Sequence, residues 1–139
     1  AEIGTNMSVF PSAKHLASWA GQCPGNDQSA GKRRSGKSRH GSKWLDWALE
    51  EAAMAAVRSK NVYLAAQYQR LRPRRGHKPA LGAVKHSIIC AAWHMLTTGV
   101  DYRDLGGDYY QRRDPEKTTK RLIAQLERLG HTVVLQQAA

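Results

Sequence analysis

Apolar residues recur every three to four positions in four long stretches of the chain, the spacing that puts them on one face of a helix. These stretches cover residues 42–60, 62–72, 80–98 and 114–129. The third is the most hydrophobic, so we expect it to lie at the centre of the core. A shorter helix is predicted over residues 12–20, where Ser12 can cap the first turn. The pattern therefore predicts an all-α fold of about five helices.

Prolines, glycines and capping residues set the expected ends of these helices. Pro73 is expected to stop the second stretch, because proline lacks an N–H donor and its ring crowds the preceding turn. Pro79 suits the first turn of the third helix, and Gly99 suits its C-terminal cap. Ser42 and Asp114 are expected to cap the N-termini of their helices. Two connections between the predicted helices are long, namely the segment before Ser42 and residues 99–113.

The two ends of the chain carry weaker signals. Residues 1–3 are typical of the tail of a helix that ends at Gly4. With the short helix over residues 12–20, this tail predicts a partial helix-hairpin-helix element, a motif that presents backbone amides to phosphate groups. Because the chain starts in such a tail, we expect residues 1–139 to be a single domain of a longer protein whose N-terminal portion is missing. At the other end, residues 131–135 are β-prone and either pair with a strand from outside this chain or simply trail after the last helix.

Residues 21–43 interrupt the helical pattern with a long polar stretch, GQCPGNDQSAGKRRSGKSRHGSK. It contains four serines and five glycines, and no acidic residue lies between Asp27 and Asp46. Its basic residues are Lys32, Arg33, Arg34, Lys37, Arg39 and Lys43. A stretch this polar must lie at the surface, where its glycines would let the backbone follow the contour of another molecule. We therefore predict a long, mobile, basic loop that binds a polyanion.

The charge of the whole chain supports a polyanionic partner. Its 139 residues carry 22 Lys and Arg against 11 Asp and Glu, and the net charge of +11 is typical of proteins that bind phosphate backbones. A second basic cluster lies between two predicted helices and contains Arg70, Arg72, Arg74, Arg75 and Lys78. An anionic membrane would require an amphipathic basic helix or a lipid anchor, but these basic residues lie mainly in loops. The expected partner is therefore a nucleic acid and not a membrane.

The cysteine and histidine patterns indicate neither a disulfide framework nor a metal site. Cys23 and Cys90 lack framework spacing and no membrane-spanning run is present, so a reduced cytoplasmic protein is expected. His86, Cys90 and His94 follow one another at four-residue steps, a spacing that can supply two zinc ligands. Three ligands from one straight helix do not complete a tetrahedron, and their neighbours are core residue types. No metal or other cofactor is therefore expected in this chain.

Other acidic and aromatic residues have competing interpretations. Asp101, Asp104 and Asp108 form a candidate acidic metal set, but the arginines among them favour ion pairing or solvation. Trp44 and Trp47 follow the basic stretch and either stack on unpaired bases or pack in the core. Tyrosine-recombinase chemistry is disfavoured, because no His-x-x-Arg sequence occurs.

A serine in the basic stretch, such as Ser29, has three interpretations. The structural one is that the serine caps a turn or keeps the loop soluble. The second is passive phosphate binding: residues 31–38 match the pattern GxxxxGK[ST], but neither the strand that should precede this pattern nor the helix that should open at its lysine is predicted. The third is that the serine is a nucleophile.

The third interpretation comes from a resemblance. Several motifs follow one another in order, namely Glu2-Ile3-Gly4, then Phe10, Ser12, Leu16, Trp19, Gly21 and Cys23-Pro24-Gly25, then Ser29-x-Gly31-Lys32 and Gly41-x-x-x-Leu45. In this order they resemble the C-terminal domain of the insertion-sequence transposases related to the Piv and MooV DNA invertases, a family identified with bridge-RNA-guided recombinases. The resemblance continues through residues 63–68, 85–87 and 102–106, and so covers nearly all of the chain.

The resemblance implies a two-part enzyme. An N-terminal RuvC-like domain, absent from this chain, would carry acidic ligands for a divalent metal such as Mg²⁺, and the C-terminal domain would supply a serine that attacks a DNA phosphodiester. By motif that serine is Ser29, and Lys32, Arg33 and Arg34 would stabilise charge on the attacked phosphate. The implied partners are DNA and a guide RNA, with a homo-oligomer of the full-length protein in the bacterial cytoplasm.

The expected function is therefore DNA transposition or site-specific recombination. Ser29 would cleave and rejoin strands, and the basic residues of 32–43 and 70–78 would bind nucleic acid. The chain alone is expected to bind DNA without recombining it. The alternative is a non-catalytic helical nucleic-acid-binding module, in which Ser29 only contacts phosphate.

Overall fold

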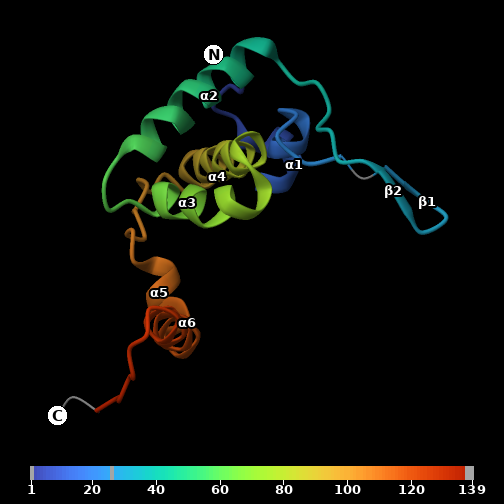
Figure 1. The fold of residues 1–139 in the computed structure, drawn as a ribbon. Helices are drawn as coiled ribbons and strands as arrows, with labels where there is room; N and C mark the ends of the chain where they lie inside the picture. Colours follow the sequence, from blue (N-terminus) through green and yellow to red (C-terminus); the bar gives the residue numbers. More distant parts are fainter. Residues whose placement is uncertain (1, 26, 137–139) are drawn as a thin grey trace.

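The computed structural model describes residues 2–25 and 27–136, without the side chains of Arg33 and Arg34. Its elements in chain order are η1 (Met7–Val9), α1 (Ala13–Trp19), β1 (Asp27–Ser29), β2 (Lys32–Ser35), α2 (Lys43–Arg58), α3 (Tyr63–Arg75), α4 (His77–Thr98), α5 (Tyr109–Arg113) and α6 (Pro115–Arg128). Helices dominate (Figure 1), and the one sheet in these residues is the hairpin β1–β2. The predicted all-α class is confirmed. None of the described helices is long and apolar enough to cross a membrane.

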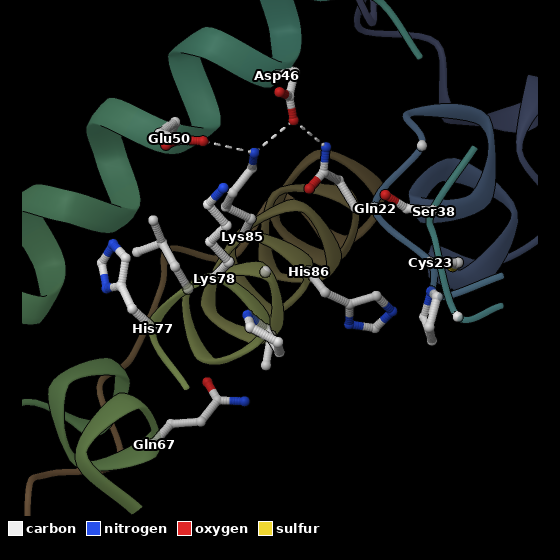
Figure 2. Close-up of a pocket in the computed structure, with 17 residues that line it drawn as sticks. Gln22, Cys23, Ser38, Asp46, Glu50, Gln67, His77, Lys78, Lys85 and His86 are labelled. Atoms are coloured by element: carbon white, nitrogen blue, oxygen red, sulfur yellow. Dashed lines mark hydrogen bonds and ion pairs between the residues drawn. The ribbon is translucent and has the colours of Figure 1, made fainter. Parts of the chain in front are cut away.

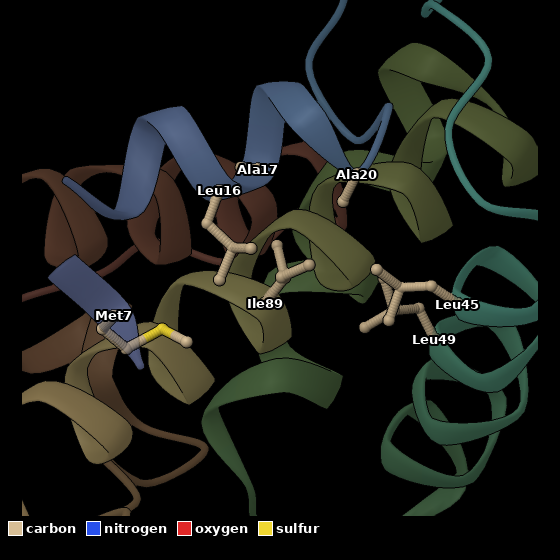
Figure 3. Close-up of a cluster of buried hydrophobic side chains, with 7 residues drawn as sticks. All are labelled: Met7, Leu16, Ala17, Ala20, Leu45, Leu49 and Ile89. Carbon is tan, nitrogen blue, oxygen red and sulfur yellow. The ribbon is translucent and has the colours of Figure 1, made fainter. Parts of the chain in front are cut away.

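Helix α4 is the central element of the helical body, as its hydrophobicity predicts. It packs against η1, α1, α2 and α3, and Figure 1 shows it among them. Leu16 of α1 and Ile89 of α4 are fully buried, and Leu45 and Leu49 of α2 complete the same cluster (Figure 3). Burial of an aliphatic side chain of this size contributes about 1.5–3 kcal/mol. This first cluster therefore ties α1 and α2 to α4.

A second cluster holds α3 against α2 and α4. Ala80 and Val84 of α4 are fully buried there, next to Tyr68 of α3 and Ala53 of α2. Ile88 packs against both clusters. The four-helix body formed by α1–α4 therefore has one continuous core.

Two helix boundaries differ from the sequence prediction. Helix α3 continues through Pro73 to Arg75, although the proline supplies no N–H donor to the last turn. The helix ends instead at Gly76, whose φ of 82° lies in the left-handed region that glycine enters without strain. Helix α4 then begins at His77 and not at Ala80, which leaves Pro79 in the first turn as predicted.

Of the three predicted N-terminal caps, two are confirmed. The Ser42 hydroxyl accepts a hydrogen bond from the Leu45 N–H at 3.3 Å, and the Asp114 carboxylate accepts one from the Lys117 N–H at 3.1 Å. Ser12 precedes α1 but its side chain makes no capping bond. Its hydroxyl is instead hydrogen-bonded to the ring of the nearby His15, at 2.8 Å.

The expected helix tail at the start of the chain is wrong where the structure describes it. Residues 2–5 are not helical, and only the short turn η1 precedes α1. Residues 2–12 therefore hold no helix that could complete a helix-hairpin-helix element. Gly4 has the predicted left-handed φ, 69°, but in a turn and not at a helix end. Residues 131–135 form no strand, since they lie beside no strand with which to pair.

Helices α5 and α6 extend from the body beyond α3 (Figure 1). Tyr63 of α3 stacks on Tyr110 of α5 with ring centroids 5.6 Å apart, and α6 contacts α5 alone among the described elements. Asp104 accepts a hydrogen bond from the Tyr63 backbone N–H at 3.1 Å and so caps α3 from a distant part of the chain. Asp108 forms an ion pair with Arg112 at 2.8 Å. These two aspartates act as a cap and an ion-pair partner, in agreement with the ion-pairing interpretation.

Candidate nucleic-acid interface

The segment predicted as a loop contains a β-hairpin, residues 27–35, which we call the basic hairpin. Its strands are antiparallel, with Ser29 opposite Lys32. The turn residues Ala30 and Gly31 have φ values of 49° and 74°, the left-handed pair that a tight two-residue hairpin requires. Sequence reasoning missed this hairpin because its strands, DQS and KRRS, contain none of the β-branched or aromatic residues that mark strands. The glycine after Ala30 was the one local signal.

Ser29 is the last residue of β1 and is exposed. The basic hairpin projects away from the helical body (Figure 1), and neither of its strands contacts a described helix. As a result, no histidine or carboxylate of a described helix lies beside the serine. The hairpin presents Ser29 to an approaching molecule without an activating base from those helices.

The first basic cluster consists of the predicted lysines and arginines of residues 32–43. Four of them are exposed, namely Lys32, Lys37, Arg39 and Lys43. The other two, Arg33 and Arg34, belong to β2, and their side chains lie outside the described part of the structure. The cluster therefore extends from the hairpin along the chain to the start of α2.

Two arms join the basic hairpin to α1 and to α2, and they run side by side in backbone contact. A Cβ atom at Gly21 would lie 2.5 Å from the carbonyl oxygen of Arg39, closer than real Cβ atoms approach. Gly25 and Gly41 are equally crowded by the backbone that faces them. Sequence analysis interpreted these glycines as a source of mobility, but in the structure they permit close approach of two chain segments. The root of the hairpin therefore depends on glycine.

The second basic cluster lies where α3 meets α4. Arg72, Arg74 and Arg75 occupy the last turn of α3 and are exposed, as is Lys78 in the first turn of α4. Arginines at a helix C-terminus also complement the helix dipole. Arg70 is placed differently, because its guanidinium lies 4.6 Å from the centre of the Tyr110 ring.

A pocket of about 760 Å³, which we call the central pocket, is lined in part by the arm that carries the first basic cluster and by Lys78 of the second. Its walls come from the two arms, from α2 and α3, and from the first half of α4 (Figure 2). Gly36 and Ser38 line it on one side, and His77 and Lys78 belong to its lining from the second cluster. The fold thus brings together two basic segments that are far apart in the sequence.

Lys85 of α4 is buried beside this pocket, with 7% of its surface exposed. Its ammonium group donates hydrogen bonds to Asp46 at 2.5 Å and to Glu50 at 3.1 Å. Gln22 also donates to Asp46, at 2.8 Å, and Figure 2 shows Gln22 and Lys85 both directed at that carboxylate. The bond from Lys85 is the main cause that lowers the pKa of Asp46 below its ordinary 3.8, against the opposing effect of partial burial.

Sequence reasoning missed this ion-pair cluster. The one available signal was the four-residue spacing of Asp46 and Glu50, which places both carboxylates on one helix face. Nothing local connects that face to Lys85, which lies in the most hydrophobic helix and 39 residues from Asp46. The contact depends on how α2 packs against α4.

The remaining candidates have clear outcomes. Trp44 and Trp47 are 75% and 65% exposed on α2, so the core interpretation is wrong and the stacking interpretation stays a prediction. Cys90 lies 3.7 Å from a ring nitrogen of His86, yet no group of three or more His, Cys, Asp or Glu side chains in the described residues is placed to hold a metal. Residues 36–42 are not helical, so the GxxxxGK[ST] match lacks the helix that a phosphate loop needs.

Comparison with known proteins finds a match to one protein family in the first part of the chain. Residues 1–69 match the model of the Transposase IS116/IS110/IS902 family. The matched part includes α1, the basic hairpin with Ser29, α2 and about half of α3. The match supports an insertion-sequence transposase domain in these residues and, with it, a general role in transposition or recombination. No curated protein and no solved structure matches the chain.

Proposed function

We propose that this chain is the C-terminal domain of a transposase, which binds DNA and a guide RNA and supplies Ser29 as the nucleophile for strand cleavage and rejoining. The position of Ser29 carries the proposal. The serine is exposed on a projecting hairpin, opposite Lys32, within the residues that match a transposase family. A narrow basic hairpin can reach a phosphate group in a DNA groove or junction that the broad helical body would not approach.

The proposed reaction is a transesterification. The Ser29 Oγ attacks a phosphodiester phosphorus, and a serine–phosphate ester forms as the bond from phosphorus to a deoxyribose oxygen breaks. The serine loses its proton and the leaving oxygen gains one. The serine–phosphate ester conserves the energy of the broken phosphodiester bond. A hydroxyl of another strand can therefore attack the ester, release the serine and complete strand exchange. Lys32, opposite the serine in the hairpin, is placed to stabilise negative charge on the attacked phosphate.

The groups that activate the serine are proposed to lie outside this chain. They would be the acids and divalent metal of an N-terminal RuvC-like domain, which would meet Ser29 in a homo-oligomer of a bacterial cytoplasmic protein. We assign no part of that chemistry to the described residues. Within this chain, the basic clusters bind and orient nucleic acid through exposed charges that displace counterions from phosphates.

The test compares Ser29→Ala with Ser35→Ala in the full-length protein. Both serines are exposed on the basic hairpin, so the pair separates chemistry from general disturbance of the hairpin. We expect Ser29→Ala to lower strand exchange by about 1,000-fold or more, as loss of a nucleophile does, with DNA affinity within about twofold of wild type. Ser35→Ala should remain active. A covalent protein–DNA adduct should map to the peptide that contains Ser29.

The alternative is a non-catalytic nucleic-acid-binding module. It is favoured by one observation, namely that no histidine or carboxylate of a described helix lies beside Ser29. Under this alternative, Ser29→Ala leaves strand exchange unchanged and no adduct forms. Lys32→Gln should weaken DNA binding and lower the salt dependence of log K by about 1 under either function, so its effect on binding does not distinguish the two functions.

A further inference from the structure

The central pocket has open space at one point of its α4 wall, next to a glycine. Gly82 of α4 lines the pocket, and a Cβ atom built on it would meet no heavy atom within 4 Å. Its neighbours in the lining are Pro79, Leu81 and Ala83 of the same helix, with Pro24 of the first arm. The open space next to Gly82 suits the face of a planar ring, because no side chain of that residue competes for it.

The walls of the pocket carry hydrogen-bonding groups. Asp46 and Glu50 supply carboxylate oxygens, and Lys85 holds both carboxylates in place from below the surface. One lysine does not use all the acceptor capacity of two carboxylates. Gln67 and His86 add amide and imidazole groups to the lining. The edges of nucleobases present amino donors and ring or carbonyl acceptors, and such edges match this mixture.

The rim of the pocket connects it to both basic clusters. Lys78 and His77 line it from the second cluster, while Gly36 and Ser38 line it from the arm that carries the first. A nucleic-acid backbone bound along these clusters would pass the pocket opening. The volume of about 760 Å³ falls within the roughly 300–1,000 Å³ of pockets that enclose small organic molecules.

From these observations we infer that the central pocket receives one unpaired nucleotide, with its base over Gly82 and its phosphate toward Lys78. The inference rests on the nucleic-acid binding proposed above and adds a base-reading site to it. An unpaired base is required, because a base inside a duplex cannot leave its stack without the energy of unpairing. Nucleotides at bulges, junctions and strand ends meet this condition.

The experiment measures the affinity of the chain for two DNA duplexes by fluorescence anisotropy at one salt concentration. One duplex carries a single unpaired adenosine, and the other carries an unpaired abasic residue at the same position. The two probes have the same phosphate charge, so electrostatic binding cancels in the comparison. We expect the adenosine probe to bind about 10-fold more tightly, since stacking of one base commonly has an effect of that size.

Gly82→Phe is the variant that fills the pocket, and Gly82→Ala is its matched control. Gly82 lies inside α4, and both changes replace glycine in a helix by a better helix former, so they should not destabilise the fold. Gly82→Phe should lose the preference for adenosine and keep its affinity for the abasic probe. Gly82→Ala should keep most of the preference. Thermal melting by circular dichroism checks that each variant is folded.

Two results would overturn the inference. Equal binding of both probes by the wild-type chain would exclude a base site, and this result needs no variant. A folded Gly82→Phe that keeps the full preference would show that the base is read elsewhere, for example on Trp44 or Trp47. Failure of the wild type to bind either probe would instead overturn the nucleic-acid binding of the proposed function.

Discussion

The helical body and the basic hairpin differ in the interactions that stabilise them. In the body, Leu16, Val84 and Ile89 are fully buried and α4 contacts every other long element of the core. In the hairpin, the described side chains are exposed and, among the described elements, the strands contact only each other. An isolated two-stranded hairpin is marginally stable at best. The residues that stabilise the fold therefore lie in α1–α4, whereas the candidate chemistry lies in residues 27–35.

The separation is not complete, because the arms attach the hairpin to the body. The close backbone contact at Gly21 and Gly41 places the root of the hairpin next to α1 and α2. The same arms form one wall of the central pocket. The tip of the hairpin is therefore free of the core, while its root belongs to the candidate interface.

Ile89→Ala should have the largest effect on stability. Ile89 is fully buried in the first cluster, and removal of such a side chain typically costs about 2–5 kcal/mol of the free energy of unfolding. Lys32→Ala, in the hairpin, should change the free energy of unfolding by less than about 0.5 kcal/mol. Urea denaturation followed by circular dichroism measures both. A large loss in Lys32→Ala would show that the hairpin supports the body and would contradict the comparison.

Lys85→Met should have an intermediate effect. The substitution keeps the buried apolar stem and removes two charge-assisted hydrogen bonds to half-exposed carboxylates, so we expect a loss of about 1–2 kcal/mol. Lys78→Met is the control, because Lys78 is exposed on the same helix and forms no ion pair with a described carboxylate. The two variants are compared by urea denaturation at pH 7. If Lys85→Met and the wild type are equally stable, the two hydrogen bonds contribute nothing and only the apolar stem of Lys85 stabilises the fold.

The pH dependence of the Asp46 contribution should be the smallest effect. Because the folded state lowers the pKa of this carboxyl, its stabilisation is fully present above the ordinary pKa of 3.8 and is lost as the pH falls further. The side chain is 50% exposed, so solvent screening should keep the contribution below about 1 kcal/mol. The difference in stability between wild type and Asp46→Asn, measured from pH 7 to pH 2.5, should shrink on acidification. A difference that grows below pH 3.8 would mean that the pKa is raised.

The long helices could largely be predicted from the sequence. Apolar periodicity and capping are local properties, so α2, α4 and α6 and the caps at Ser42 and Asp114 followed from them. The continuation of α3 past Pro73 was not predicted, because proline disfavours a helical turn before it without excluding one. The hairpin could not be predicted, since short polar strands are defined by their pairing and turn and not by side-chain preference.

The candidate site was predicted in part. The chemical type of residues 29–43 follows from composition, because a basic, glycine-rich stretch has to be exposed. The central pocket does not, since its lining joins Gln22, Asp46 and Lys85 through packing of separate helices and an arm. The sequence likewise did not decide whether Trp44 and Trp47 are exposed, because a tryptophan on a helix suits either the core or the surface.

By itself, then, the sequence determined the helical class, the excess of positive charge and the polar character of the segment that carries Ser29. The tertiary structure alone decided that glycines in the arms permit close approach, that a buried lysine binds two carboxylates and that both basic clusters flank one pocket. The physical reason is the distance along the sequence over which the deciding interactions act. A helix and its charge are defined by residues within a few positions of one another, whereas burial and neighbourhood depend on which surfaces the whole chain brings together.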